Sequence, residues 1–355
     1  MNDLLLTRLR LARTPGVGPR TALLLEERCG SPPEMFRRSA EELCACGVPP
    51  RIARALAADG PLREARAELE EQRRLGHRLL ARGDPDYPEA LEGLDDPPQV
   101  LSFRGELPLG GARAVAVVGA RRATREGRDL AYQLGLELAA AGVLVVSGLA
   151  RGIDTAAHEG ALEAGGRTVA VLGSGLCEVY PRRNRGLAER IARQGALVSE
   201  LPPRMPPTRH TFPQRNRIVT GLAWGVVVVQ AGPRSGALLS ADLALQQGRE
   251  LFAVPGSVRD PLAQGTNALL KDGARLVTSA RDVLDLLDGV QGVPDPEPPL
   301  SPAAQALLAH LEERAQDELE LSTRAGLGPE DAARALGELL LWGQARRTPR
   351  GFALR

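Results

Sequence analysis

The feature that most constrains the fold is a series of short runs of β-branched and apolar residues, which alternate with longer helical stretches. From Ala114 onward the runs read, in order, AVAVVG, VLVVSG, TVAVLG, ALVSE, GVVVVQ, LFAVPG and RLVTS. Runs that are apolar throughout are typical of strands buried on both faces, because helices cover both sides of a parallel sheet. The sequence therefore predicts an α/β fold with a doubly wound, mostly parallel sheet.

The composition changes at several points along the 355 residues, and these changes predict the domain organisation. Residues 1–78 have helical periodicity without a strand pattern and predict a small helical domain. Residues 79–289 contain the strand runs, after an extension rich in Pro, Asp and Gly. Residues 290–300 are a proline-rich acidic linker, which cannot build a core. Residues 301–355 read as three helices and a basic hairpin, which is the outline of a winged helix.

The two outer domains each leave a choice open. The segment Thr14–Thr21, TPGVGPRT, has the glycine pattern of a helix-hairpin-helix turn, in which backbone N–H groups approach a phosphate. The alternative is a tight turn between two packed helices. In the last domain, the helical segments Glu318–Ala325 and Pro329–Trp342 carry five acids against two arginines, whereas a recognition helix for duplex DNA is basic. Protein contact or scaffolding is therefore favoured there over groove recognition.

The net charge of +1 excludes a uniformly basic surface, so a site for a polyanion must come from clustered arginines. Lys271 is the only lysine, and arginine offers a planar donor fork that suits phosphate. The four cysteines lack the spacing of a metal site, so we expect reduced thiols and no metal. No apolar stretch approaches the roughly 18 residues of a membrane helix, and the N-terminus lacks the apolar core of a signal peptide. We therefore expect a cytoplasmic protein.

The segment Thr208–Leu222, TRHTFPQRNRIVTGL, is the strongest candidate for such a cluster. It contains no acid, and it places four basic side chains around one aromatic ring: Arg209, His210, Arg215, Arg217 and Phe212. The apolar run Val226–Val229 and the glycine-serine loop Ala231–Ala237 follow it, so we expect the cluster beside the end of a buried strand. Open α/β sheets bind ligands at such strand ends.

Most of the predicted strands end in loops of small residues. These loops are Gly119–Arg122, Ser147–Gly148, Gly173–Gly175, Ala231–Ala237 and Pro255–Ser257. Because the carboxyl ends of parallel strands share one edge of the sheet, we expect the loops and the following helix N-termini to form one anion-binding crevice. The arginines expected around this crevice are Arg121, Arg122, Arg151, Arg182, Arg183, Arg185, Arg209, Arg215 and Arg217.

Arginines spread over several loops favour an extended polyphosphate over a mononucleotide, whose phosphate needs only one or two. Single-stranded nucleic acid fits best, because Phe212 and Tyr180 are placed to stack unpaired bases, at about 1 to 3 kcal/mol each. The alternative for Phe212 is a wedge packed under the loop. A dinucleotide cofactor is not expected, since the first turn reads GARRAT and Gly173–Glu178 ends in glutamate, which breaks the G-x-G-x-x-G pattern. His158 has no partner at catalytic spacing, so we expect it to be structural.

Eight segments between Val117 and Ala274 resemble, in order, the motifs of the DNA processing protein A (DprA/Smf) family: VVGARRAT, VVSGLARGIDTAAHEGAL, AVLGSGLCEVYPRRNRGL, GALVSELPP, FPQRNRI, AGPRSGALLSADLAL, FAVPGS and QGTNALLKDGA. The resemblance implies an extended Rossmann-like domain that binds and protects single-stranded DNA and helps to load the recombinase RecA in natural transformation, usually as a homodimer. Strand ends and resemblance together predict these DNA-binding residues: Gly119, Ala120, Arg121, Arg122, Ser147, Gly148, Gly173, Ser174, Gly175, Arg209, Phe212, Arg215, Asn216, Arg217, Ser235, Gly236 and Ala237.

Two positions depart from the expected family pattern. Gln230 stands where a glutamate is expected, and Arg209 stands where some members have lysine; neither change removes a phosphate donor.

The rival class is an enzyme, a nucleoside monophosphate phosphoribohydrolase of the LOG type, whose motif PGGxGTxxE places a catalytic glutamate at a helix start. Aligned on Gly236, this chain has Ser240 at the glutamate position. A serine with no base beside it cannot act as the general acid or base. We therefore expect a binding protein and no enzyme; a plain scaffold without nucleic acid is the remaining alternative.

Overall fold

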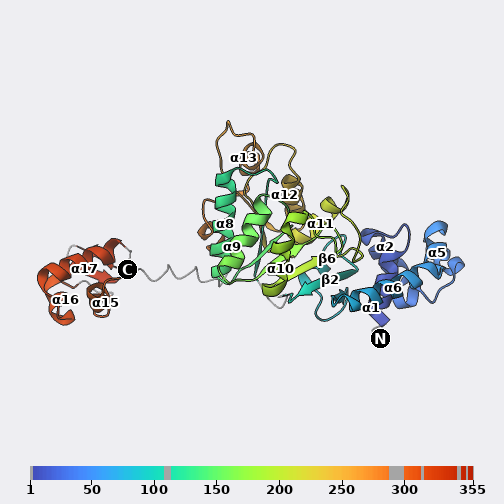
Figure 1. Cartoon of the computed structure of the whole chain (residues 1–355), viewed down its shortest axis with the longest axis horizontal. Coiled ribbons are helices and arrows are strands. Elements are labelled where there is room, and N and C mark those ends of the chain that lie inside the picture. Colours follow the sequence, from blue (N-terminus) through green and yellow to red (C-terminus); the bar gives the residue numbers. More distant parts are fainter. Residues whose placement is uncertain are drawn as a thin grey trace. The chain divides into compact units, whose positions relative to one another are not determined.

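A computed structural model of the chain describes residues 3–107, 113–287, 300–312, 316–341, 345–348 and 351–354 (Figure 1). The chain forms two compact units, Met1–Val290 and Gln291–Arg355. The first unit contains both the predicted helical segment and the sheet, so a separate domain that ends at residue 78 stays a prediction. The linker predicted at 290–300 lies outside the described residues, except for Leu300. No helix in these described ranges is long and apolar enough to cross a membrane.

Nine strands form one sheet in the order β1-β2-β6-β5-β4-β3-β7-β8-β9. Their bounds are β1 (Arg78–Ala81), β2 (Val100–Gly105), β3 (Ala114–Val118), β4 (Leu144–Ser147), β5 (Thr168–Val171), β6 (Ala196–Ser199), β7 (Gly225–Val228), β8 (Glu250–Ala253) and β9 (Arg275–Leu276). The strands from β6 across to β9 pair in parallel, while β2 is antiparallel to both β1 and β6. The predicted mostly parallel α/β sheet is confirmed, and β1 is a strand that the sequence pattern does not predict.

Helices cover both faces of this sheet (Figure 1). They are α7 (Glu89–Glu92), α8 (Arg125–Ala140), α9 (Ile153–Glu163), η1 (Arg182–Asn184), α10 (Arg185–Gln194), α11 (Thr211–Gly221), α12 (Gly236–Gln246), α13 (Gln264–Lys271) and α14 (Arg281–Leu284). Val169 and Val171 of β5 belong to the apolar cluster that includes Ile218 of α11, whereas Ala170 between them belongs to the cluster of Ile191 in α10. The strand runs are apolar throughout because each face meets its own layer of helices.

Two helices begin earlier than the sequence predicts: the cap and glycine pattern predicts one over Thr155–Ala164, after an Asp154 cap, and one over Ser240–Gln247. Helix α9 begins at Ile153, and its N-cap is Gly152 with φ of 79°, so Asp154 lies in the first turn and is not the cap. Helix α12 begins at Gly236, four residues before the predicted start at Ser240, because the Ser235 side chain caps it by accepting from the N–H of Ala237. Both shifts bring a helix N-terminus closer to the end of a strand.

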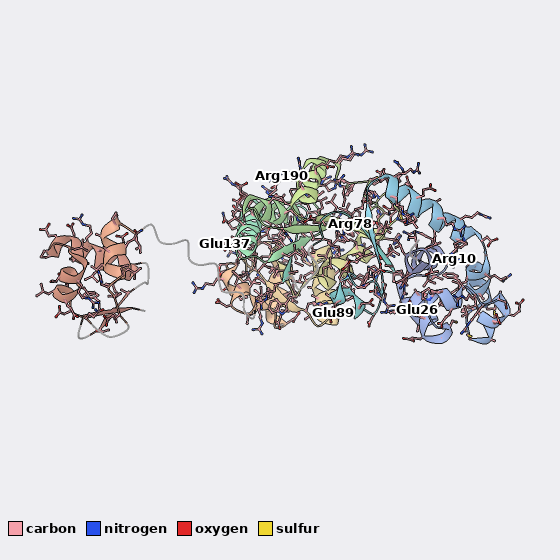
Figure 2. The ribbon with its side chains drawn as sticks, turned by 90° about the horizontal axis from the view of Figure 1, so that it is seen from below. Arg10, Glu26, Arg78, Glu89, Glu137 and Arg190 are labelled. Carbon is pink, nitrogen blue, oxygen red and sulfur yellow. The ribbon has the colours of Figure 1, made fainter. Side chains whose placement is uncertain are left out.

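Six helices fill the N-terminal part of the first unit: α1 (Asp3–Arg13), α2 (Pro19–Cys29), α3 (Pro32–Met35), α4 (Ala40–Ala45), α5 (Pro50–Ala57) and α6 (Gly60–Arg74). Glu26 of α2 (Figure 2) pairs with Arg8 of α1 at 2.5 Å and with Arg82, just after β1, at 3.3 Å. An apolar cluster also joins Leu9 of α1 to Val100 of β2. Helices α1 and α2 therefore contact the antiparallel edge of the sheet.

The second unit contains α15 (Pro302–Leu308), α16 (Glu318–Ala325), α17 (Pro329–Leu341) and an antiparallel pair of strands, β10 (Ala345–Thr348) and β11 (Gly351–Leu354). Leu307, Leu321 and Leu339 contribute one apolar core from its three helices. Asp317 caps α16 at one end, and Gly326 with φ of 65° ends it. The predicted three helices and hairpin are present, whereas the assignment of a winged helix stays a prediction.

Candidate nucleic-acid interface

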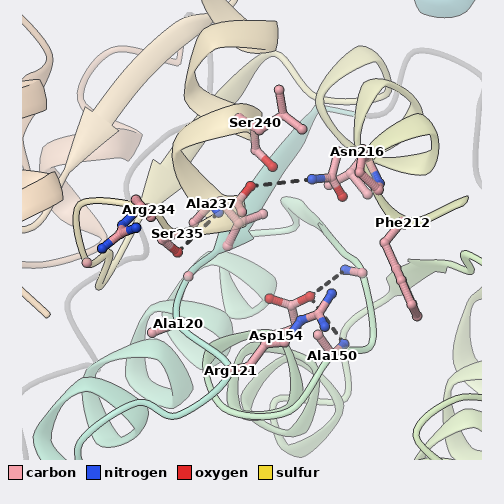
Figure 3. Close-up of a pocket in the computed structure, with 18 of the residues that line it drawn as sticks. Ala120, Arg121, Ala150, Asp154, Phe212, Asn216, Arg234, Ser235, Ala237 and Ser240 are labelled. Carbon is pink, nitrogen blue, oxygen red and sulfur yellow. Dashed lines mark hydrogen bonds between the residues drawn. The ribbon is translucent and has the colours of Figure 1, made fainter. Parts of the chain in front are cut away.

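A cavity of about 900 Å³ lies at the carboxyl end of β3 (Figure 3). Strand β3 is flanked by β4 on one side and by β7 on the other, so the chain reverses its direction across the sheet at this strand. Such a switch point is where open α/β sheets form ligand crevices. The predicted residues that line the cavity are Gly119, Ala120, Arg121, Arg122, Gly148, Arg209, Phe212, Arg215, Asn216, Ser235, Gly236 and Ala237. A crevice is therefore present at the strand ends, formed by three of the five predicted loops; Gly173–Gly175 and Pro255–Ser257 do not line it.

The loop after β3 forms one wall, and it is held by the residue that departs from the family pattern. The Gln230 carbonyl accepts from the N–H of Ala120 at 2.8 Å. The Gln230 side chain accepts from the N–H of Thr124 and donates to its hydroxyl, both at 3.0 Å. Thr124 in turn caps α8. The amide of Gln230 thus uses a donor and an acceptor to fix the loop that carries Arg121 and Arg122.

Phe212 packs against the loop that contains Gly173 on one side and contacts Arg121 on another. A Cβ atom on Gly173 would approach Phe212 Cδ1 to 2.8 Å, so this glycine makes room for the ring. The guanidinium carbon of Arg121 lies 4.9 Å from the centroid of the Phe212 ring. The centroids of the Tyr180 and Phe212 rings are 5.6 Å apart, and the angle between the two ring planes is 51°. Phe212 is half-buried and still lines the cavity, so its environment contains elements of both predicted roles.

The N-terminus of α12 forms the floor of the cavity. The Ser235 side chain accepts from the N–H of Ala237 at 3.3 Å, and Asn216 of α11 donates to the Gly236 carbonyl at 3.5 Å. Helix N-termini carry a partial positive charge and free N–H groups, both of which favour a bound anion. The cavity therefore combines an anion-binding helix end with the arginine side chains around it.

Four arginines line the cavity with exposed side chains: Arg121, Arg122, Arg209 and Arg234. Within the described ranges of the chain, none of them has an ion-pair partner within 4.0 Å. Arg234 is not among the predicted site residues, although it stands in the same glycine-serine loop as Ser235. By contrast, Arg151, Arg182, Arg183 and Arg185 are exposed but do not line the cavity.

Arg215 differs from its predicted role as a phosphate donor. It is 5 % exposed, and its Nη1 atom donates to the carbonyl oxygens of Gly148, at 2.5 Å, and Val171. Burial lowers the pKa of Arg215 to about 10, with nearby Asp154 acting in the opposite direction. Arg215 thus joins α11 to the ends of β4 and β5 from the cavity wall. The spacing of Thr211, Arg215 and Ile218 places it on the buried face of α11.

Arg217 lies outside the cavity, and this position corrects the prediction that it contacts DNA there. Only 4 % of it is exposed, and it pairs with Glu200 at 2.7 Å and with Asp96 at 3.2 Å. It lines a separate pocket of about 220 Å³ that also contacts the predicted hairpin turn at Val17 and Gly18. Both acids come from other segments, so the sequence around Arg217 does not reveal them.

Ser147, Gly173, Ser174 and Gly175 are also absent from the cavity lining. Ser147 donates to the Val117 carbonyl at 2.7 Å, and Ser174 donates to the Glu178 carbonyl at 2.6 Å, both from buried positions. A Cβ atom on Gly175 would overlap the carbonyl oxygens of the Pro202–Pro203 turn. These residues support the loops and do not face the cavity.

Asp154 lines the cavity, although the sequence pattern predicts it only as a helix cap. It is 6 % exposed, and its Oδ2 atom accepts from the N–H groups of Gly148 and Ala150, each at 3.2 Å. Burial raises the pKa of this carboxyl group, while the charge of Arg215 opposes the shift. The sequence GLARGID indicates this role of Asp154, because a carboxylate after two glycines is suited to accept hydrogen bonds from free loop N–H groups.

His158 is structural, as predicted. It is fully buried in α9, and its Nδ1 atom lies 2.7 Å from the Thr168 hydroxyl. Since that hydroxyl donates to the Val145 carbonyl, it accepts from His158, which fixes the proton on Nδ1.

Comparisons with known proteins show the family to which the chain belongs. The sequence model of the family described as DNA recombination-mediator protein A matches residues 78–288, which include the sheet and the cavity. The chain belongs to this family. The Protein Smf of Escherichia coli is 40% identical over 287 residues, which cover 78% of this chain and 77% of that protein. The DNA processing protein DprA of Bacillus subtilis is 41% identical over 220 residues, which cover 62% of this chain and 74% of that protein.

Two solved structures of the DprA family have the same fold. The DprA of Streptococcus pneumoniae superposes with a TM-score of 0.69 at 32% identity and covers 81% of this chain and 98% of its own. The DNA processing protein A of Helicobacter pylori, described for its unique single-stranded DNA binding mode, has a TM-score of 0.54 at 32% identity. That match covers 59% of this chain and 94% of the Helicobacter chain.

Proposed function

We propose that this protein binds single-stranded DNA, independently of base sequence, in the cavity at the carboxyl end of β3. The observation that carries the proposal is the group of exposed arginines around the N-terminus of α12, which form no ion pair within 4.0 Å with any described residue. Arginine forks on separate loops suit successive phosphates of a strand. The relatives named DNA processing protein, and the Helicobacter protein described as binding single-stranded DNA, support the same ligand.

The biological role that we propose is that of the family. The protein acts in the cytoplasm as a homodimer, protects incoming single-stranded DNA, and assists the loading of RecA during natural transformation and recombination. Light scattering at micromolar concentration tests the dimer, because a monomer at that concentration contradicts it. A RecA-loading test needs DNA coated with single-strand binding protein, on which this protein is expected to speed the assembly of RecA.

Removal of the Arg121 guanidinium tests the site. We expect Arg121→Ala to weaken binding of oligothymidine about tenfold or more, since a hydrogen bond to a charged group is worth about 1.5–3 kcal/mol. The plot of log affinity against log salt becomes flatter by about 0.7 when one phosphate contact to a single strand is lost. Fluorescence anisotropy of a labelled oligothymidine at several NaCl concentrations measures both quantities.

The matched control is Arg190→Ala, which removes the same charge from the exposed surface of α10 (Figure 2), outside the cavity. This variant is expected to keep the affinity and the salt slope of the unaltered protein. If Arg121→Ala also leaves both unchanged, the cavity is not the binding site.

We also propose that the protein is not an enzyme. Ser240, the residue at the position of the catalytic glutamate in the phosphoribohydrolases, is 3 % exposed and supplies no carboxylate. Incubation of the protein with nucleoside monophosphates is expected to release no free base. Release of base that disappears in an Asp154→Asn variant instead assigns the cavity to catalysis.

A further inference from the structure

Asp154 is the one acid among the described residues that line the cavity. A carboxylate repels phosphate, so its presence beside unpaired arginines is unexpected in a site that holds only a DNA backbone. Its two oxygen atoms have different surroundings. Oδ2 accepts from two backbone N–H groups of the loop after β4, as Figure 3 shows.

The second oxygen, Oδ1, is available to a ligand. It has no hydrogen-bond partner in the described part of the chain. The enclosed polar atoms that lack a partner do not include Oδ1, so this atom is accessible. Because Asp154 lines the cavity, Oδ1 faces that space. An ionised carboxylate oxygen only accepts hydrogen bonds, so the group that it meets must carry an N–H or an O–H.

Charge neutralisation of Arg215 is the competing explanation for Asp154. The charges of Arg215 and Arg121 both act to lower the pKa of Asp154, but the ion pairs within 4.0 Å among the described residues include neither arginine. Arg215 already donates to the carbonyls of Gly148 and Val171. Neutralisation alone therefore leaves the free Oδ1 atom without an explanation.

The other walls of the cavity suit a nucleobase. Val118, Val219 and Leu262 contribute apolar surface, and Phe212 contributes an aromatic ring. A volume of about 900 Å³ lies within the range of clefts that enclose whole small molecules, roughly 300–1,000 Å³. In DNA the phosphate and the deoxyribose within a chain carry no N–H or O–H donor, whereas every base has an N–H on its Watson–Crick edge.

We propose that Asp154 Oδ1 accepts a hydrogen bond from an N–H on the Watson–Crick edge of one unpaired base, which enters the cavity while the arginines hold the adjacent phosphates. This inference rests on the proposed function and adds a base-binding subsite to it. Since all four bases offer such an N–H, the contact selects unpaired bases over paired ones and does not require a particular sequence.

The variant Asp154→Asn converts this acceptor into a donor at constant size. Its carbonyl oxygen must face the N–H groups of Gly148 and Ala150, because an NH₂ group in that place would oppose two donors. The NH₂ group then takes the position of Oδ1. Three oligonucleotides of equal length serve as probes: oligothymidine, an oligomer of N3-methylthymidine that lacks the N–H, and an abasic oligomer.

We expect the unaltered protein to bind oligothymidine roughly tenfold or more tightly than the N3-methyl oligomer, as for one hydrogen bond to a charged acceptor. In Asp154→Asn this ratio falls to near one. The abasic oligomer reports phosphate binding alone, and its affinity stays equal or rises in the variant because a negative charge has been removed.

Two outcomes overturn the inference and leave the proposed function intact. In one, the unaltered protein binds the two thymidine oligomers equally, a result that requires no variant and so does not depend on its folding. In the other, Asp154→Asn retains its native thermal transition and the same preference. If the unaltered protein binds none of the three probes, the proposed function itself fails.

Discussion

At the scale of single residues, His158 shows how burial determines a charge state. Its imidazole is fully buried against Thr168, and desolvation lowers its pKa to about 3 from 6.5. The folded protein therefore keeps His158 neutral, while the unfolded chain takes up a proton below pH 6.5. Between pH 6.5 and about 3 the unfolded state binds one more proton, so this residue makes the folded state less stable as the pH falls.

We expect a contribution of about 1.4 kcal/mol per pH unit in this window. The variant His158→Asn retains a donor toward Thr168 but does not titrate. As the pH is lowered, its free energy of unfolding is therefore expected to decrease less steeply than that of the unaltered protein, by about 1.4 kcal/mol per pH unit. Urea unfolding at pH 6.0, 5.2 and 4.5 measures the two slopes. Trp224 is the fluorescence reporter, in a Trp342→Phe background that leaves one tryptophan. Parallel slopes for the two proteins contradict a neutral His158 in the folded state.

The arginines predicted to contact DNA differ in whether the structure places them in the cavity. Arg121 and Arg122 follow a strand directly, and their position at a loop places them in the cavity without knowledge of the remaining chain. Arg217 meets Glu200 and Asp96 only after folding, since its two partners lie in other segments. A basic residue is therefore predictable as a ligand contact only where no distant acid reaches it.

At the scale of elements, close contact between α8 and α9 positions two of the loops that line the cavity. The loop from Gly119 leads into α8, and the loop from Gly148 leads into α9. The helices approach each other at glycines: a Cβ atom on Gly135 would overlap the carbonyl oxygen of Ala157, and one on Gly160 would overlap that of Tyr132. Because both obstacles are backbone atoms, an added methyl group forces the helices apart.

We expect Gly160→Ala to destabilise the protein by about 1–3 kcal/mol, the usual cost of overpacking. Calorimetry or thermal fluorescence should show a lower Tm for the first unit. The control is Gly186→Ala in α10, where a Cβ atom meets nothing within 4 Å. That change is expected to be neutral or slightly stabilising, since alanine favours a helix more than glycine does. An unchanged Tm for Gly160→Ala contradicts the close packing of α8 and α9.

Elements with strong apolar runs are the ones that a sequence predicts well. The runs around Val117, Val145 and Val227 become β3, β4 and β7, because parallel strands are buried on both faces. Strand β1 is four residues long and directly follows a helical stretch, so its pattern does not distinguish it. The early start of α12 depends on the side chain of Ser235, which forms its cap only once the loop has folded.

At the scale of the whole molecule, charge is divided unevenly between the two units. Residues 291–355 contain ten acids and seven arginines, a net charge of −3, which leaves +4 for residues 1–290. The exposed cavity arginines belong to the first unit, whereas the first turns of α16 and α17 are acidic. The second unit is therefore poorly suited to hold phosphates, and we assign binding of single-stranded DNA to the first.

A protein that ends at residue 290 tests this division. It retains every residue that lines the cavity, so we expect its affinity for oligothymidine and the slope of log affinity against log salt to match those of the full chain. Loss of the negative unit removes a long-range repulsion of DNA, so any difference at low salt is expected to be stronger binding, and it disappears as salt screens the charges. Anisotropy titrations at 0.05 to 0.3 M NaCl compare the two proteins, with an equal Tm of the first unit as the control for folding. A tenfold weaker affinity together with a flatter slope contradicts the assignment, because the second unit then supplies phosphate contacts of its own.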